Sequence, residues 1–237
     1  MESLLAIAAK APITPAELSR ALGVPVSTTY RYLSSLRKHG LIWELSDATL
    51  APGPRCVQLE AGFRRTFHQS SYRELMAQLS RETGETVALL VPQGDEAICI
   101  DTIESTAPLR YTFSKGVAKP MLLGASAKAM LPWLDADWLE NAIATSPDLD
   151  DGQRARLRSE LPQIESRGYA TSIGEVDQGV WAVGAPVFKS NGALDASISV
   201  IAPHFRVMGV EQRLTELLVD TAAAMTHSNG WEHEYAA

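Results

Sequence analysis

The stretch 23-GVPVSTTYRYLSSLRKHGLI-42 places short hydroxyl side chains and cations on one predicted helix. Val26, Tyr30, Leu33 and Leu36 recur at helical spacing, which predicts that they face a core. The opposite face then offers groups of the kind that bond phosphates and base edges in a DNA major groove. This stretch raises the question whether the chain reads DNA.

The segment before this helix carries strong signals for a second, shorter helix. Thr14 is a predicted N-cap, Pro15 suits the first helical position, and Glu17 completes a capping box. Gly23 ends the helix as a C′ residue. Residues 3–10 add an earlier apolar helix, and 41-LIWEL-45 followed by a turn and a short return strand predicts a hairpin. Three helices and a hairpin define a winged helix-turn-helix, which we place at residues 1–52.

The exposed face of the third helix supplies the candidate DNA contacts. Arg31 is the first candidate for base readout, because arginine can bond guanine through two hydrogen bonds, and Lys38 is the candidate for phosphate. An ordinary solvated helix face is the alternative, and charge alone does not decide between the two. The residues predicted to contact DNA are Pro25, Ser27, Thr28, Thr29, Arg31, Tyr32, Ser35 and Lys38.

Charge supports a basic N-terminal region within an acidic protein. The net charge of the 237 residues is -7, but residues 1–70 hold eight Lys and Arg against five Asp and Glu. No apolar run approaches the roughly 18 residues of a membrane span, and the N-terminal residues show no export signal. We therefore expect a cytoplasmic protein without a membrane partner. Cys56, Cys99 and the scattered histidines show no metal-ligand spacing, so neither a metal nor a cofactor is predicted.

Residues beyond the hairpin predict a linker helix at 53–70, with a break near 69–71, and a second domain at 71–237. Strand-like runs at 85–93, 96–104 and 108–116 precede predicted helices at 122–134, 135–143 and 150–168. A hairpin over 179–203, with a turn at Ser190–Asn191–Gly192, and a helix at 211–228 complete the pattern. Strands in a mixed antiparallel order, flanked by helices, predict an α+β sensor-like domain.

Signatures of catalysis are poor. Ser126 with Lys128 and Ser199 with His204 are the best pairs of a nucleophile and a base that the chain offers, and neither matches a known catalytic spacing. No catalytic residue is predicted. An enzyme, such as a hydrolase or isomerase with an N-terminal interaction module, remains one alternative. A DNA-binding protein whose C-terminal domain only oligomerises is another.

The second domain also contains candidates for a small-molecule pocket. The segment 124-GASAKA-129 could present backbone N–H groups to a carboxylate at the start of a helix. Strands that carry Tyr111, Trp181 and Ser199 could form the walls. Alternatively, the small residues only allow a helix to pack closely on the sheet.

Three segments together resemble the isocitrate lyase regulator (IclR) family of bacterial transcription factors: LSRALGVPVSTTYRYLSSLRKHGLI, KPMLLGASAKAML, and RGYATSIGEVDQGVWAVGAPVF with ASISVIAP. The resemblance covers residues 3–228. It implies a winged helix-turn-helix, a linker helix and a GAF-like mixed-sheet effector domain, assembled as a homodimer or as a tetramer built from two dimers. It further implies a ligand-responsive regulator, more often a repressor, that binds operator DNA of a catabolic operon and senses a small organic acid.

The resemblance also implies an effector pocket. The family's helix-start amides match Ala125 and Ser126, its pocket serine matches Ser199, and an apolar wall position matches Tyr111. These groups could hold a carboxylate.

Other pocket positions differ from family members that bind very small acids. Ser172, Ala182 and Ile201 stand where those members have an aspartate, a cysteine and a second serine, and Trp181 lies beside them. The site becomes more apolar, and an indole could stack on a ring. We therefore expect an aromatic carboxylate as effector. Trp181 could instead point into the core, because neighbouring residues on a strand face opposite sides.

Overall fold

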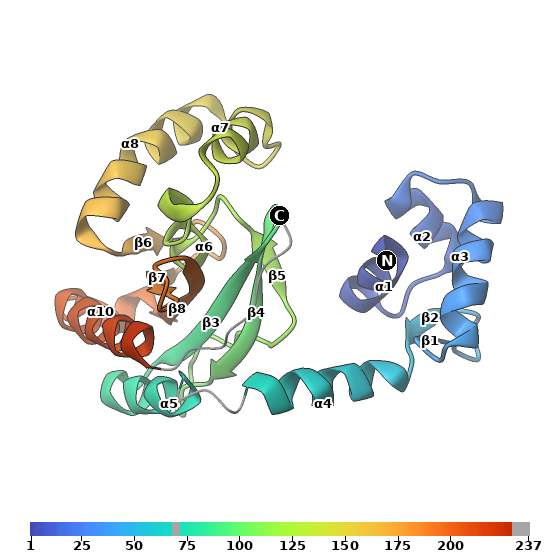
Figure 1. Cartoon of the computed structure of the whole chain (residues 1–237), viewed down its shortest axis with the longest axis horizontal. Helices are drawn as coiled ribbons and strands as arrows, with labels where there is room; N and C mark the ends of the chain where they lie inside the picture. Colours follow the sequence, from blue (N-terminus) through green and yellow to red (C-terminus); the bar gives the residue numbers. More distant parts are fainter. Residues whose placement is uncertain (68–71, 229–237) are drawn as a thin grey trace. The chain divides into compact units, whose positions relative to one another are not determined.

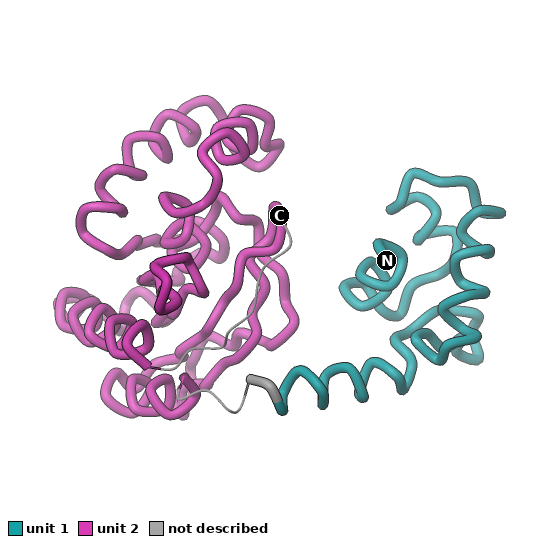
Figure 2. The backbone as a smooth tube through the Cα atoms, in the orientation of Figure 1, with its two compact units in different colours: residues 1–68 teal, residues 69–237 magenta. Residues whose placement is uncertain are grey.

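The chain folds as two compact units, residues 1–68 and 69–237 (Figure 2). The computed structural model describes residues 1–67 and 72–228. The break predicted near residues 69–71 lies outside the described residues. Among the described residues, no helix has the length and apolar character needed to cross a bilayer.

The first unit is a winged helix-turn-helix followed by a long helix. Its core consists of fully or almost fully buried side chains from all three N-terminal helices and the hairpin, among them Ile7, Leu18, Leu33 and Ile42. The elements are α1 (Glu2–Lys10), α2 (Pro15–Leu22), α3 (Val26–Lys38), β1 (Ile42–Glu44), β2 (Leu50–Pro52) and α4 (Arg55–Phe67). Strands β1 and β2 pair antiparallel and form the wing.

The predicted capping of α2 is confirmed. The Thr14 hydroxyl accepts a hydrogen bond from the Glu17 backbone N–H at 3.2 Å, and the Glu17 carboxylate accepts one from the Thr14 N–H at 2.9 Å. Gly23 ends the helix in the left-handed conformation. Together these contacts satisfy backbone groups that a short helix would otherwise leave without partners.

The predicted buried face of α3 is confirmed at Leu33 and Leu36 and is wrong at Val26 and Tyr30. Val26 and Tyr30 are 44% and 53% exposed, whereas Thr29 and Leu33 are 0% and 1% exposed. Positions 29, 33 and 36 also repeat at helical spacing, so periodicity alone fits both faces. Threonine can occupy the inner face because its methyl group packs there, while its hydroxyl donates to the Pro25 carbonyl oxygen at 3.3 Å.

The second unit is an α+β domain built on one antiparallel sheet, in which the described residues form six strands in the order β5-β4-β3-β8-β7-β6 (Figure 1). Helices α5 and α10 contact one face of the sheet, and α6 contacts the other. The elements are α5 (Tyr72–Thr83), β3 (Thr86–Gln93), β4 (Glu96–Ile103), β5 (Ala118–Pro120), α6 (Ala125–Lys128), the 3-10 helix η1 (Leu131–Trp133), α7 (Ala136–Thr145), α8 (Asp151–Arg167), β6 (Ala170–Ile173), β7 (Val180–Phe188), β8 (Leu194–Pro203), α9 (His204–Val207) and α10 (Glu211–His227).

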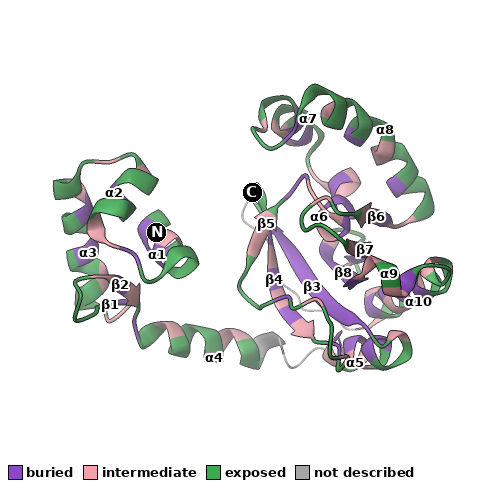
Figure 3. Cartoon of the chain, turned by 180° about the vertical axis from the view of Figure 1, so that it is seen from behind, coloured by how far each residue is buried: buried purple, intermediate pink, exposed green. Residues whose placement is uncertain are grey.

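The core of this unit lies on both faces of the sheet. Strand β3 is buried along almost its whole length (Figure 3), because helices cover the sheet on each side. On the α6 side, alternate residues such as Ala88 and Leu90 pack with Ala125 and with Leu139 and Ile143 of α7. Helices α7 and α8 thus close this side of the sheet around α6.

Two predicted elements of the second unit differ from the structure. Residues 108–116 are not a strand, and the third strand of the chain in this unit is β5, which comes later. Side chains hold the intervening segment in an irregular path: the Thr86 hydroxyl donates to the Tyr111 carbonyl oxygen at 2.7 Å, and the Ser105 hydroxyl donates to the Gly84 carbonyl oxygen at 2.6 Å. The helix predicted at 122–134 divides into α6 and η1.

A buried carboxylate ties α5 to the sheet. Asp101 on β4 is 1% exposed, and Arg73 of α5 and Lys115 both form ion pairs with it. Burial alone would raise the pKa of Asp101, but hydrogen bonds from Arg73 and Lys115 outweigh it and hold the pKa below the usual 3.8.

We expect this carboxylate to make the second unit acid-sensitive. A folded-state pKa below the unfolded value stabilises the fold above pH 3.8, and the stabilisation is lost as the pH falls below it. In urea titrations from pH 7 to pH 2, Asp101→Asn should therefore show a flatter dependence of unfolding free energy on pH than the wild type. Asp95→Asn, at an exposed turn residue, is the control. An unchanged slope in Asp101→Asn would contradict the assignment.

Candidate functional site

The exposed face of α3 is the first candidate site. The structure exposes six of the eight predicted DNA contacts, and Thr28 is half-buried. The exposed residues are Pro25, Ser27, Arg31, Tyr32, Ser35 and Lys38. The guanidinium of Arg31 lies 6.0 Å from the centre of the Tyr32 ring, so these two side chains are neighbours on that face.

Thr29 is a correction to the predicted set. Its side chain is fully buried and bonded to the Pro25 carbonyl, so it supports the helix from inside and cannot contact DNA. Arg37 has a structural partner as well: its guanidinium bonds the Glu44 carboxylate at 2.5 Å and links α3 to the wing. Arg31 and Lys38, the other two cations of α3, form no ion pair with the wing among the described residues.

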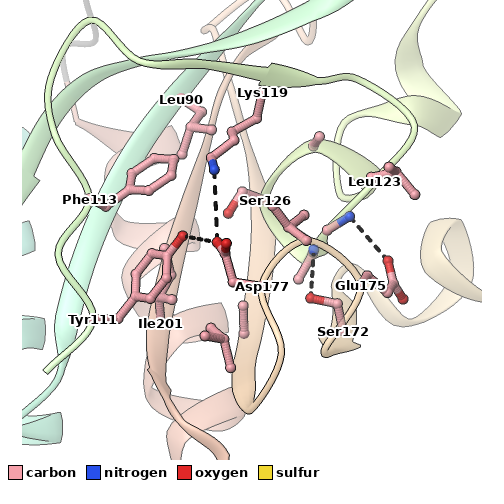
Figure 4. A pocket seen from close by; sticks show the side chains of 16 residues that line it. Leu90, Tyr111, Phe113, Lys119, Leu123, Ser126, Ser172, Glu175, Asp177 and Ile201 are labelled. Carbon is pink, nitrogen blue, oxygen red and sulfur yellow. Dashed lines mark hydrogen bonds and ion pairs between the residues drawn. The ribbon is translucent and has the colours of Figure 1, made fainter. Parts of the chain in front are cut away.

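The second candidate site is a cavity of about 50 Å³ on the α6 side of the sheet (Figure 4). Its wall is mainly apolar, with a few polar groups at two ends. The lining residues are Leu90, Tyr111, Phe113, Lys119, Leu123, Gly124, Ala125, Ser126, Ala127, Ser172, Glu175, Val176, Asp177, Val180, Ala182 and Ile201.

One end of the cavity is formed by the start of α6. The Ala125 N–H donates to the Ser172 hydroxyl at 3.0 Å, and the Gly124 N–H donates to a Glu175 carboxylate oxygen at 3.1 Å. These amides therefore already carry acceptors supplied by β6 and by the loop that follows it. A ligand carboxylate at the Ala125 N–H would therefore have to replace the Ser172 hydroxyl as its acceptor.

The other end is formed by Tyr111 and Lys119. The Tyr111 hydroxyl donates to Asp177 at 2.5 Å, and the Lys119 ammonium lies 3.8 Å from the same carboxylate oxygen (Figure 4). Burial raises the pKa of the Tyr111 phenol, and the hydrogen bond to Asp177 and its charge raise it further. Tyr111 thus stays a hydrogen-bond donor over the whole physiological range.

The floor of the cavity comes from the central strands. Ala182 and Ile201 are register partners on β7 and β8, and their side chains share one face of the sheet. Gly184 lies on this face too, where a Cβ atom would come within 2.6 Å of the Ala125 carbonyl oxygen. The start of α6 can therefore approach the sheet closely only because residue 184 has no side chain.

Two predicted pocket residues do not line the cavity. Trp181 is 3% exposed and lies on the opposite face of β7 from Ala182, so the expected indole wall is absent and the alternative core position is correct. Ser199 shares the face of Ile201 but is fully buried beside Gly184, and its hydroxyl has no hydrogen-bond partner among the described residues. The six residues that the structure brings together are Tyr111, Ala125, Ser126, Ser172, Ala182 and Ile201.

Sequence reasoning missed the ionic residues of this cavity. Glu175 and Asp177 are two acids near a predicted turn, where carboxylates are usually solvated, and no motif marks Lys119 or Phe113. The loop between β6 and β7, the segment before β5 and β5 itself bring them together over a large sequence separation. The two glycines that bracket the loop, Gly174 and Gly179, were the one local hint that its path is constrained.

The pairs considered for catalysis are not assembled for it. The Lys128 ammonium bonds Glu160 at 2.9 Å and Glu175 at 2.7 Å, so its contacts are with these two carboxylates rather than with Ser126. Ser199 is buried. Among the described residues, no cluster of three or more potential metal ligands is found. A winged helix-turn-helix joined to an α+β domain that contains a cavity is the architecture of a ligand-responsive DNA-binding regulator.

Comparison with known proteins gives the same class. The family description "Bacterial transcriptional regulator IclR C-terminal" matches residues 68–227, and "IclR helix-turn-helix domain" matches residues 4–44. The chain belongs to the IclR family of transcriptional regulators, which are not enzymes.

Individual relatives cover nearly the whole chain. The HTH-type transcriptional regulator KipR of Bacillus subtilis is 29% identical over 94% of this chain and 92% of its own length. The transcriptional repressor IclR of Escherichia coli is 25% identical over 90% of this chain and 82% of its own length. The crystal structure of an IclR transcriptional regulator from Alicyclobacillus acidocaldarius has the same fold, with a TM-score of 0.78, 22% identity and coverage of 97% and 96%.

Proposed function

We propose that this protein is a ligand-controlled repressor of a catabolic operon in the bacterial cytoplasm. The observation that carries this proposal is a partly open, mainly apolar cavity with polar groups at both ends, in a chain whose first unit is a winged helix-turn-helix with an exposed third helix. Support for the negative sign of regulation comes from the relative in Escherichia coli that is named a repressor. A homodimer, or a tetramer of two dimers, would place two such helices on an operator with two half-sites.

On DNA, we assign base readout to Arg31 and phosphate contacts to Lys38 and to the hydroxyls of Ser27, Thr28 and Ser35. Arginine reads guanine through two parallel hydrogen bonds, whereas lysine and hydroxyl groups bond phosphate oxygens without regard to sequence. Pro25 lies at the N-terminal end of this exposed surface, and Tyr32 lies beside Arg31 in its middle. Thr29 has no part in it.

The effector that best fits the cavity is an aromatic carboxylate. Phe113, Leu90 and Ile201 supply apolar walls, while the start of α6 at Ala125 and Ser126, together with Ser172, supplies donors for an anion. The buried, unpartnered hydroxyl of Ser199 would gain a partner if the cavity opened toward it. The volume of about 50 Å³ is smaller than the roughly 150 Å³ that holds a benzene ring, so binding requires the cavity to open.

A ligand panel tests this proposal. Thermal unfolding is measured with benzoate, 4-hydroxybenzoate, isophthalate, glyoxylate and pyruvate, and calorimetry follows for each compound that shifts the melting curve. An effector at a hundred times its Kd should stabilise the fold by about 2.7 kcal/mol. Arg31→Ala, which alters only the DNA surface, should respond as the wild type does.

Two results would contradict parts of the proposal. Tighter binding of glyoxylate or pyruvate than of the benzoates would exclude an aromatic effector. If no compound of the panel shifts the melting curve, the result would favour a second domain that only oligomerises.

A further inference from the structure

The loop between β6 and β7 lies over the cavity and carries two carboxylates into its lining. Residues 174–179 have the sequence GEVDQG, and Glu175, Val176 and Asp177 all line the cavity. Gly174 and Gly179 adopt φ values of 67° and 76°, which favour glycine. The loop is therefore bracketed by two residues at which the backbone can turn most easily.

The two carboxylates are held very differently. Glu175 accepts a hydrogen bond from the Lys128 ammonium at 2.7 Å, and the Lys128 side chain is only 4% exposed and also bonds Glu160 of α8. Such a buried and doubly paired cation holds Glu175, because releasing Glu175 would remove one of the two carboxylates that compensate the Lys128 charge in the interior.

Asp177 is held by weaker contacts. Its side chain is 47% exposed, its ion pair with Lys119 is long at 3.8 Å, and its hydrogen bond from the Tyr111 hydroxyl is its one short contact to the cavity wall (Figure 4). Exposed ion pairs contribute little to stability. The Asp177 end of the loop can therefore move away from the cavity wall at a modest cost in free energy. Lys119 also lies 5.8 Å from the centre of the Phe113 ring, and this contact does not depend on Asp177.

We infer that Asp177 is an internal competitor that occupies an anion subsite of the effector. The subsite consists of the Tyr111 hydroxyl and the Lys119 ammonium, at the end of the cavity opposite the start of α6. An effector with two acidic groups places one at α6 and the other at this subsite, where it displaces the Asp177 carboxylate and releases the loop. This inference rests on the proposed effector function of the cavity.

The inference makes the effector class more specific. A monocarboxylate satisfies only the α6 end and leaves Asp177 in place, so the loop stays closed. An aromatic dicarboxylate satisfies both ends and replaces one carboxylate by another at Tyr111 and Lys119. Because only the dicarboxylate requires the open loop, its apparent affinity equals its affinity for the open form multiplied by the fraction of molecules whose loop is open.

The test compares isophthalate with benzoate by calorimetry on the full-length protein. Asp177→Asn should bind isophthalate about tenfold tighter than the wild type, a change of roughly 1.4 kcal/mol, and should bind benzoate as the wild type does. Lys119→Met should remove the preference for isophthalate over benzoate. Gln178→Ala, an exposed residue of the same loop, is the matched control and should change neither affinity. Unchanged or weaker isophthalate binding by Asp177→Asn overturns the inference.

A second readout needs no ligand and separates this inference from the proposed effector class. Amide hydrogen exchange of residues 174–179 should be faster in Asp177→Asn than in the wild type and unchanged in Gln178→Ala. If neither compound binds any variant and exchange is faster in Asp177→Asn, the proposed effector class is wrong but the tether by Asp177 stands. Exchange that is the same in Asp177→Asn and wild type overturns the inference, whatever the ligands do.

Discussion

Gly184→Ala is expected to destabilise the second unit by about 3 kcal/mol, near the upper end of the range for overpacked cores. A Cβ atom at residue 184 would lie 2.6 Å from the Ala125 carbonyl oxygen and 3.0 Å from the Ser126 Cα atom. Both contacts are with backbone, so no side chain can rotate away to relieve them. The start of α6 must then move off the sheet, which also distorts the amide end of the cavity.

Urea unfolding followed by tryptophan fluorescence measures this effect. Gly62→Ala is the control, because a Cβ atom there would be 3.8 Å from its nearest neighbour and alanine is favoured over glycine inside a helix. The control should leave the unfolding of the second unit unchanged. If Gly184→Ala unfolds at the same urea concentration as the wild type, the close approach of α6 to β7 is incorrect.

The second large effect is expected at the DNA surface. Arg31→Ala should weaken binding to the specific operator by about 1–3 kcal/mol and reduce discrimination between operator and unrelated DNA. The physical reason is the loss of a bidentate contact to a base edge, which distinguishes sequences, while phosphate contacts remain. Fluorescence anisotropy with labelled operator and unrelated duplexes of equal length measures both quantities.

Lys38→Ala and Arg213→Ala complete this experiment. Lys38→Ala should weaken binding to both duplexes equally and lower the salt dependence by about one counterion, as expected for a phosphate contact. Arg213 is exposed on α10 of the second unit, so its replacement should leave both affinities unchanged. If Arg31→Ala weakens both duplexes to the same extent, Arg31 contacts phosphate and another residue reads the bases.

Local signals in the sequence were sufficient for much of the fold. The capping box of Thr14 and Glu17 and the helix end at Gly23 are interactions between residues close in the chain, and the structure shows each of them. The hairpin of β7 and β8, with Gly192 at positive φ in its turn, is equally local. Such features follow from capping and turn chemistry alone, without knowledge of the tertiary structure.

The sequence-based predictions were wrong where tertiary contacts, and not local signals, determine the structure. Thr29 replaces Tyr30 on the inner face of α3, because two helical spacings fit the pattern and only the packing of the unit chooses between them. The predicted strand at 108–116 is absent: the side chain of Thr86, distant in the sequence, bonds the Tyr111 carbonyl oxygen, and the later residues 118–120 form the strand that pairs with β4. Neither effect leaves a periodic trace in the sequence.

The candidate cavity was predictable only in part. The start of α6 could be found because small residues and a glycine mark it, and Ala182 with Ile201 follows from strand alternation. Alternation also removes Trp181 from the cavity, since it neighbours Ala182. Lys119 and Asp177 could not be paired in advance, because their contact depends on how strand β5 and the loop between β6 and β7, far apart in the chain, approach each other.

The most direct test of site-specific DNA binding is a titration of the wild-type protein on the DNA upstream of its own gene and on unrelated DNA of equal length. Both titrations are carried out at two salt concentrations, because binding to phosphates alone weakens steeply with salt. A regulator that reads bases through α3 should retain a complex with the upstream DNA at the higher salt, at which the unrelated DNA is released. Equal loss of both complexes would contradict sequence-specific binding by this helix.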